Sequence, residues 1–265
     1  MKLQKIEKLK NNKYKIHLEN EKLITFDNVI IENNLLYKKN IDNDLYNKIL
    51  LDTEYYDIYN KTVKYILKKR RSEKEIKIYL TKSNLSNNQI EKIISKLKDI
   101  NLINDIEYCK AYINDKVYLS KSGVSKIRNE LIEQNISLDI INKELNLIDK
   151  DIFINRLEKM IINKINSNKK YSNLYLKNKI LNEMIKLGYE KENILDIIEK
   201  NLKKDNLIIN KEFDKIYIKL SKKYSGEDLK KKVEQKMMLK GFNIYEVKEL
   251  LKKTEEWLFF CFCFS

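Results

Sequence analysis

Two copies of one short motif carry residues that could bind an anion. The letters Lys-Lys-Tyr-Ser occupy positions 169–172 and again positions 222–225, so the copies begin 53 residues apart. Two neighbouring lysines offer two ammonium groups, which bind phosphate or carboxylate oxygens as point charges. The motif therefore indicates two cationic sites at equivalent positions of a repeated sequence, formed by Lys169 with Lys170 and by Lys222 with Lys223.

Two further groups of basic residues lie in the first half of the chain. Arginine is scarce in this lysine-rich sequence, and its planar guanidinium makes fixed, forked contacts with carboxylates and phosphates. A second interpretation is open for all these cations, because basic residues at a solvated helix end offset the helix dipole. The candidate contact residues in these groups are Lys69, Arg70, Arg71 and Lys74, and then Lys121, Lys126 and Arg128.

The charge of the whole chain points to an anionic partner. The sequence has 54 Lys and Arg against 39 Asp and Glu, which gives a formal net charge of +15. A positive field of this size favours polyanions or an acidic protein surface. Enrichment in Lys, Asn and Ile is also what an AT-rich genome produces, so composition alone does not decide between these explanations.

No catalytic, metal or cofactor motif is present in the sequence. The single histidine, His17, falls within an expected strand, and the three cysteines have no framework of spacings, which predicts a reduced, cytoplasmic protein without a bound metal or cofactor. The basic N-terminus lacks the continuous apolar core of a signal peptide. The apolar run at 257–264 is shorter than the roughly 20 residues that span a bilayer, so we expect no membrane association.

Five apolar positions recur four times, which indicates that one unit is repeated along the chain. Successive copies are offset by 51, 53 and 53 residues, and all twenty positions are apolar, against 43% hydrophobic residues overall. Such self-similarity is typical of helical repeat proteins. The anchors of the four units are Ile76, Leu80, Leu85, Ile90 and Ile94; Ile127, Leu131, Ile136, Ile141 and Leu145; Ile180, Met184, Tyr189, Ile194 and Ile198; Val233, Met237, Phe242, Val247 and Leu251.

The residue before each third anchor predicts how the helices of a unit are joined. It is Asn84, Asn135, Gly188 or Gly241, and Asn and Gly tolerate the left-handed conformation that ends a helix. With this residue at the C′ position, the second and third anchors are the two residues that contact each other in a Schellman ending. We therefore expect a helix, a tight turn and a second helix in each unit, with one further helix in front.

The expected fold is mainly α, with tandem three-helix repeats in an elongated curved array and a small β-rich N-terminal cap. The cap covers residues 1–50, where KYKIHL and KLITF alternate apolar and polar residues as a β-hairpin does. The absence of proline and the presence of only 4 glycines suit long helices. The repeats are expected at 54–104, 105–150, 151–210 and 211–256, followed by an apolar tail of unknown role at 257–265.

Two stretches of the chain resemble the RecX family of recombinase regulators. KKRRSEKEIKIYLTK, at 68–82, is similar to the opening of the family's first repeat, and LINDIEYCKAYINDKVYLSKSGVSKIRNEL, at 102–131, is similar to its second. The resemblance covers nearly the whole chain and is strongest over 55–145. Val124 stands where the family usually has proline, Cys109 replaces a usual alanine, and Asn114 and Lys116 occupy positions that are often arginine.

The resemblance implies a regulatory, non-enzymatic function. RecX proteins bind the RecA recombinase within the groove of its filament on single-stranded DNA. There they limit filament growth, and with it ATP hydrolysis, strand exchange and coprotease activity. The expected partners of this chain are therefore the RecA filament and the single-stranded DNA inside it, bound by a monomer. The alternative is a basic helical-repeat protein that binds nucleic acid without a recombinase partner.

Overall fold

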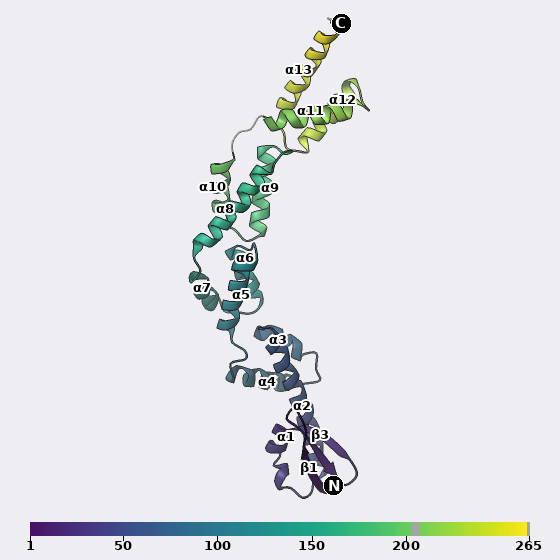
Figure 1. Cartoon of the computed structure of the whole chain (residues 1–265), viewed down its shortest axis with the longest axis vertical. Coiled ribbons are helices and arrows are strands. Elements are labelled where there is room, and N and C mark those ends of the chain that lie inside the picture. Colours follow the sequence, from purple (N-terminus) through teal and green to yellow (C-terminus); the bar gives the residue numbers. More distant parts are fainter. Residues whose placement is uncertain (203–206, 264–265) are drawn as a thin grey trace. The chain divides into compact units, whose positions relative to one another are not determined.

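A three-stranded sheet at the N-terminus is followed by a succession of helices (Figure 1). The structure is a computed structural model that describes residues 1–202 and 207–263. The strands are β1 Leu3–Lys8, β2 Lys13–Leu18 and β3 Lys22–Phe26, followed by α1 Asp27–Glu32 and the short 3₁₀ helix η1 Leu35–Tyr37. The remaining helices are α2 Asn43–Lys68, α3 Glu73–Leu80, α4 Asn87–Asp99, α5 Asp105–Leu119, α6 Val124–Glu133, α7 Leu138–Asn146, α8 Lys150–Asn166, α9 Asn173–Lys186, α10 Lys191–Asn201, α11 Leu207–Ser221, α12 Gly226–Met238 and α13 Ile244–Cys263.

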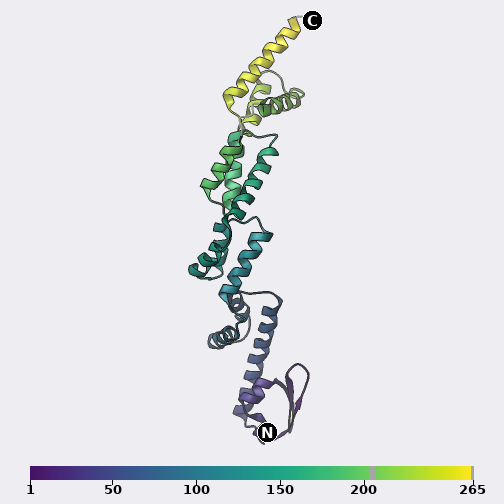
Figure 2. The same ribbon diagram turned by 60° about the vertical axis from the view of Figure 1, so that its left-hand side comes forward.

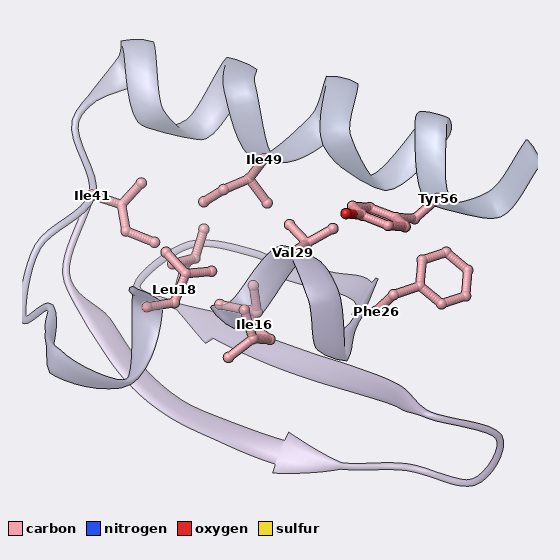
Figure 3. Close-up of a cluster of buried hydrophobic side chains, with 9 residues drawn as sticks. Ile16, Leu18, Phe26, Val29, Ile41, Ile49 and Tyr56 are labelled. Atoms are coloured by element: carbon pink, nitrogen blue, oxygen red, sulfur yellow. The ribbon is translucent and has the colours of Figure 1, made fainter. Parts of the chain in front are cut away.

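The N-terminal cap is an antiparallel sheet covered on one face by helices. The strand order is β1-β2-β3, so the predicted hairpin of β2 and β3 is confirmed, and β1 adds a third strand beside β2. Ile16 and Leu18 of the central strand are buried together with Val29 of α1 and Ile49 of α2, as Figure 3 shows. Alternate residues of a strand point to opposite faces, which explains why Ile16 and Leu18 share the buried one.

The long helix α2 connects this cap to the first helical repeat (Figure 2). Ile49 and Tyr56 of α2 belong to the apolar cluster of the cap, whereas Ile66 near its end packs in a second cluster with Ile76 and Leu80 of α3. A helix of this length can serve both clusters because its buried stripe repeats every 3.6 residues. The expected order of a β-rich cap and a mainly helical remainder is confirmed.

The chain divides into two compact units that are not continuous in sequence. The first contains Met1–Tyr112 and Leu131–Ile141, and the second contains Ile113–Glu130 and the chain from Asn142 onward. The two units therefore alternate along the sequence between residues 112 and 142. The beginning of α6 belongs to the second unit, and the end of α6 with the turn that follows it belongs to the first.

The apolar anchors that revealed the repeat are core residues. Of the twenty, nineteen are buried, and Leu85 alone among them is partly exposed. Burial of a large aliphatic or aromatic side chain contributes about 1.5–3 kcal/mol, so these positions supply much of the stability of each helix group. The boundaries 54–104, 105–150, 151–210 and 211–256 remain a prediction.

Three of the four predicted helix endings are confirmed as Schellman motifs. Asn135, Gly188 and Gly241 have φ angles of 63°, 87° and 80°. In each case the next residue donates its backbone N–H to the carbonyl of the second anchor, which is the 6→1 hydrogen bond of this motif. These bonds are Ile136 to Leu131 at 3.2 Å, Tyr189 to Met184 at 3.1 Å and Phe242 to Met237 at 3.2 Å.

The corresponding prediction for Asn84 is wrong. Asn84 does not have a positive φ, and α3 ends at Leu80, four residues before it. The carbonyl of Leu80 accepts instead from both the backbone N–H of Ser83, at 3.0 Å, and its hydroxyl, at 2.6 Å. Because this side chain already satisfies the helix end, no left-handed residue is required there, and Leu85 is left partly exposed.

The last helix extends through the predicted apolar tail. α13 runs to Cys263, while the side chains at 257–263 and the residues 264–265 lie outside the described part. The prediction that the cysteines bind no metal therefore lies outside the described residues for Cys261 and Cys263. Among the helices formed by described residues, none is long and apolar enough to cross a membrane.

Candidate anion-binding loops

Each repeat has a loop between its first and second helix, and exposed basic residues occur in all four. These loops, which we call the basic loops, are residues 69–72, 120–123, 167–172 and 222–225. The lysine pairs were expected on the end of a helix but lie just beyond it, because α8 ends at Asn166 and α11 at Ser221. The exposed cations of the basic loops are Lys69, Arg70, Lys121, Lys169, Lys170, Lys222 and Lys223.

The serine that ends the first Lys-Lys-Tyr-Ser copy has a local role in starting a helix. Ser172 is the N-cap of α9, and its hydroxyl accepts from the backbone N–H of Tyr175 at 3.2 Å. Ser72, at the end of the first basic loop, forms a full capping box with Glu75. A capped helix start fixes the direction in which the chain enters it. The cations just before these serines are therefore presented at a defined helix start.

The loop 167–172 is folded by one asparagine, which leaves its lysines in solvent. Asn168 donates from Nδ2 to the carbonyl of Tyr171 at 2.8 Å, and its Oδ1 accepts from the Tyr171 backbone N–H at 3.1 Å. The Tyr171 ring is stacked on Tyr175, with centroids 4.6 Å apart, and Lys179 Nζ lies 5.2 Å from its centroid. Cations beside aromatic rings are typical of sites for single-stranded nucleic acid, in which the cations contact phosphates and the rings stack on bases.

The loop 120–123 is held by an arginine that the sequence patterns did not identify. Arg156 of α8 donates to the carbonyls of Val117, Ser120 and Ser122 at 2.6, 2.7 and 3.0 Å. Its Nε donates to the hydroxyl of Tyr189 at 3.0 Å. Three of these four hydrogen bonds go to backbone carbonyls, and those to Ser120 and Ser122 fix the backbone on either side of the exposed Lys121. The scarcity of arginine was the only signal in the sequence that could have marked this residue.

The first basic cluster is divided between internal and external roles. Arg71 is committed inside the fold, with Nη1 3.1 Å from Glu75 Oε1 and its guanidinium 4.3 Å from the centroid of the Tyr65 ring. Lys74 donates to the carbonyl of Glu133 at 2.6 Å. Lys69 and Arg70 are exposed, although Arg70 lies 3.6 Å from Glu107. Of the four cations that the sequence grouped together, only Lys69 and Arg70 are therefore exposed to solvent.

Lys126 and Arg128 lie on α6 rather than in a loop, and both are partly buried. Lys126 stands against the turn at Gly188, where a Cβ on the glycine would be 2.4 Å from the Lys126 backbone nitrogen. Arg128 lines a pocket, and its Nε is buried without a hydrogen-bond partner. The structure thus separates these two residues from the exposed cations of the basic loops.

Most cations of the basic loops are not neutralised by the protein itself. In the part of the chain that the structure describes, Lys69, Lys121, Lys169, Lys170, Lys222 and Lys223 form no ion pair. Elsewhere in the chain exposed lysines do pair with nearby carboxylates, as Lys61 does with Asp57 at 2.6 Å. Unpaired cations at recurring positions are available to external phosphate or carboxylate groups. Among the described residues, no group of three or more His, Cys, Asp or Glu could hold a metal ion.

Comparison with known proteins extends the similarity along almost the entire chain. No protein-family model matches. A protein of Streptococcus gordonii named "Regulatory protein RecX" is 28% identical over 259 residues, which cover 95% of this chain and 99% of the relative. Proteins of the same name from Bacillus cytotoxicus and Listeria innocua are 29% identical over 234 residues, covering 86% of each chain, and 27% identical over 201 residues, covering 74% of each.

Solved structures show the same kind of fold. A crystal structure of a regulatory protein RecX matches with a TM-score of 0.67 at 19% identity, covering 75% of this chain and 98% of that one. A RecX structure from Lactobacillus salivarius matches with a TM-score of 0.51 at 24% identity, covering 56% of this chain and 96% of that one. The resemblance predicted from 68–82 and 102–131 is confirmed, and the fold class is confirmed with it.

Proposed function

We propose that this homologue of the RecX regulatory proteins binds the RecA recombinase filament and inhibits its growth, ATP hydrolysis, strand exchange and coprotease activity. The observation that carries the proposal is the similarity to proteins named "Regulatory protein RecX" over nearly the full length of both chains. Its biological setting would be the control of DNA repair, recombination and the SOS response in the cytoplasm. The proposed role is one of binding, without catalysis or a cofactor.

The basic loops supply a physical means of holding such a filament. Lys69, Lys121, Lys169 and Lys222 each begin or occupy one loop, and none is ion-paired within the described residues. A filament on single-stranded DNA presents phosphates and acidic side chains, which are the groups that unpaired lysines bind. We propose that the four repeats of a monomer present these loops to the filament.

The test is the ATPase activity of RecA on single-stranded DNA with this chain added at substoichiometric amounts. Inhibition below one molecule per recombinase subunit is expected, because blocking growth at few positions affects many subunits. Unchanged hydrolysis, together with tight binding to the DNA alone, would favour the alternative of a nucleic-acid-binding protein without a recombinase partner. The unpaired lysines of the basic loops are compatible with that alternative.

A further inference from the structure

Arg128 is a cation held at the edge of an apolar pocket without a counter-ion. Its side chain is partly buried and its Nε is sealed from solvent with no hydrogen-bond partner. Within the described part of the chain no ion pair includes it. A partly buried charge without a counter-ion costs free energy, and a carboxylate of a ligand that pairs with the accessible outer nitrogens would offset this cost.

The pocket beside Arg128 has the character of a site for a protein side chain. Its walls include Leu145, Phe153 and Leu157, which are buried, and Ile154, which is 43% exposed at the rim. Polar residues in the lining include Lys150 and Asn193. Predominantly apolar walls with a few placed polar groups are typical of a binding pocket. Glu190 also lines it, but its Oε2 accepts from Asn193 Nδ2 at 3.4 Å.

The equivalent position of the first repeat shows the contrasting arrangement. Arg128 follows the anchor Ile127, and Lys77 follows the equivalent anchor Ile76. Lys77 Nζ lies 3.1 Å from carboxylate oxygens of both Glu73 and Glu91, and these carboxylates raise the pKa of Lys77. A cation at the same register is thus neutralised by the protein in one repeat and left without a carboxylate in the other.

We propose that this pocket, which we call the Arg128 pocket, binds a segment of the protein partner in which an apolar side chain is adjacent to a carboxylate. The apolar side chain enters between Leu145, Phe153 and Leu157, and the carboxylate pairs with the guanidinium. Arg binds carboxylates through two parallel hydrogen bonds, which here would come from the two outer guanidinium nitrogens, because Nε is sealed from solvent. The inference rests on the proposed function, because the recombinase is the partner that supplies the segment.

Protein is favoured over nucleic acid as the occupant on two grounds. Single-stranded DNA carries a charged phosphate on every nucleotide, whereas the walls of this pocket are mainly apolar and include few cations. The unpaired lysines that suit phosphates lie in the basic loops, whereas the Arg128 pocket combines a partly buried arginine with Leu145, Phe153 and Leu157. Preference of the pocket for an oligothymidine over an acidic peptide would overturn the proposal.

The first experiment measures binding of a labelled peptide to the full chain by fluorescence anisotropy. The probe is a fluorescein-labelled decapeptide with one Phe between two glutamates in a Gly-Ser background. Two control peptides carry Gln in place of Glu, or Ser in place of Phe. We expect Arg128→Gln to weaken binding of the probe about tenfold or more, because a hydrogen bond to a charged group is removed. The matched control is Lys143→Gln, which removes the same charge from an exposed position of α7.

A second variant keeps the proposal testable if Arg128→Gln fails to fold. Ile154→Glu changes a lining residue that is 43% exposed and adds a carboxylate to the same pocket, where it repels the carboxylate of the ligand. This variant should bind the probe more weakly by a similar factor, and its thermal unfolding temperature should equal that of the wild type. Equal binding by the wild type and both variants, equal binding of the Gln control peptide, or no binding by the wild type at millimolar peptide would each overturn the proposal.

The second experiment separates failure of the pocket from failure of the proposed function. The same preparations are tested for inhibition of RecA ATPase on single-stranded DNA. If wild type inhibits and Arg128→Gln inhibits several-fold less, the recombinase supplies the segment. If both inhibit equally, the proposed function stands and the pocket's assignment to the recombinase falls. If neither inhibits although the probe binds through Arg128, the pocket stands as a peptide site and the proposed function falls.

Discussion

The backbone N–H of Gly123 donates to the carbonyl oxygen of Leu187 at 2.6 Å, which brings the start of α6 directly onto the turn between α9 and α10. The contact continues with Ser125, whose N–H donates to the carbonyl of Gly188 at 3.2 Å. A helix start has free N–H groups and a Schellman turn has outward carbonyls, so each satisfies the other.

The same relationship recurs at the start of two other second helices. Ser172, before α9, donates its backbone N–H to the carbonyl of Lys240, next to Gly241, at 3.0 Å. Ser72, before α3, uses its side chain instead and donates from its hydroxyl to Gln134 Oε1, next to Asn135, at 2.9 Å. Each basic loop that ends in one of these contacts is therefore anchored to the turn of the following repeat.

We predict that Gly123→Ala destabilises the protein by about 1–3 kcal/mol, as overpacking typically does. A Cβ at this position would lie 2.4 Å from the carbonyl oxygen of Gly188 and 2.6 Å from its carbonyl carbon. Both are backbone atoms, which cannot rotate away as the end of a flexible side chain can. Urea-induced unfolding followed by circular dichroism measures the change.

Gly226→Ala is the matched control for this change. A Cβ there meets nothing within 4 Å, but the φ of Gly226 is +53°, so the expected cost of about 1–2 kcal/mol comes from the left-handed backbone alone. Gly123→Ala tests steric contact without a positive φ. A Gly123→Ala variant as stable as wild type would contradict the close backbone contact with Gly188.

Truncation of an anchor should affect stability far more than truncation of an exposed leucine. Leu131 is fully buried and its carbonyl accepts from Ile136 in the Schellman motif, so Leu131→Ala is expected to cost about 2–5 kcal/mol. Leu119 is 82% exposed, and Leu119→Ala should change the free energy of unfolding by no more than about 0.5 kcal/mol. Similar thermal unfolding of the two variants would refute the assignment of Leu131 to the core.

Arg156→Lys tests whether the fork of the guanidinium, rather than its charge, holds the loop 120–123. Lysine keeps the charge but cannot reach the carbonyls of Val117, Ser120 and Ser122 and the hydroxyl of Tyr189 at once. A hydrogen bond to a charged group contributes about 1.5–3 kcal/mol, and we expect destabilisation of at least that size. Hydrogen exchange should also become faster at Lys121 and Ser122, and unchanged exchange there would count against this role.

Local sequence patterns predicted those parts of the fold that depend on nearby residues. The endings at Asn135, Gly188 and Gly241 follow from residue type and from apolar anchors four positions before and one position after, so local sequence was sufficient to predict them. The error at Asn84 has the same origin, because the pattern did not weigh the hydroxyl of Ser83 as a competing partner for Leu80.

Long-range contacts could not be predicted in this way. Arg156 bonds with carbonyls 34 to 39 residues away, and nothing in its own neighbourhood in the sequence indicates them. The same holds for Lys74, which was grouped with exposed cations but donates to the carbonyl of Glu133, 59 residues away. Clusters of cations could be located in the sequence, whereas the exposure and ion pairing of each cation depend on the fold.

The recurring lysines give the most direct test of the proposed DNA contact. We expect the quadruple replacement of Lys169, Lys170, Lys222 and Lys223 by Gln to preserve the fold, because all four are exposed. The slope of log affinity against log salt for single-stranded DNA should flatten by about 0.7 for each phosphate that the variant no longer binds, and filament inhibition should weaken. A charge-matched control replaces four exposed lysines outside the basic loops, namely Lys38, Lys39, Lys82 and Lys143. If the control flattens the slope equally, only net charge matters; if neither variant changes slope or inhibition, the lysine pairs are merely solvated residues.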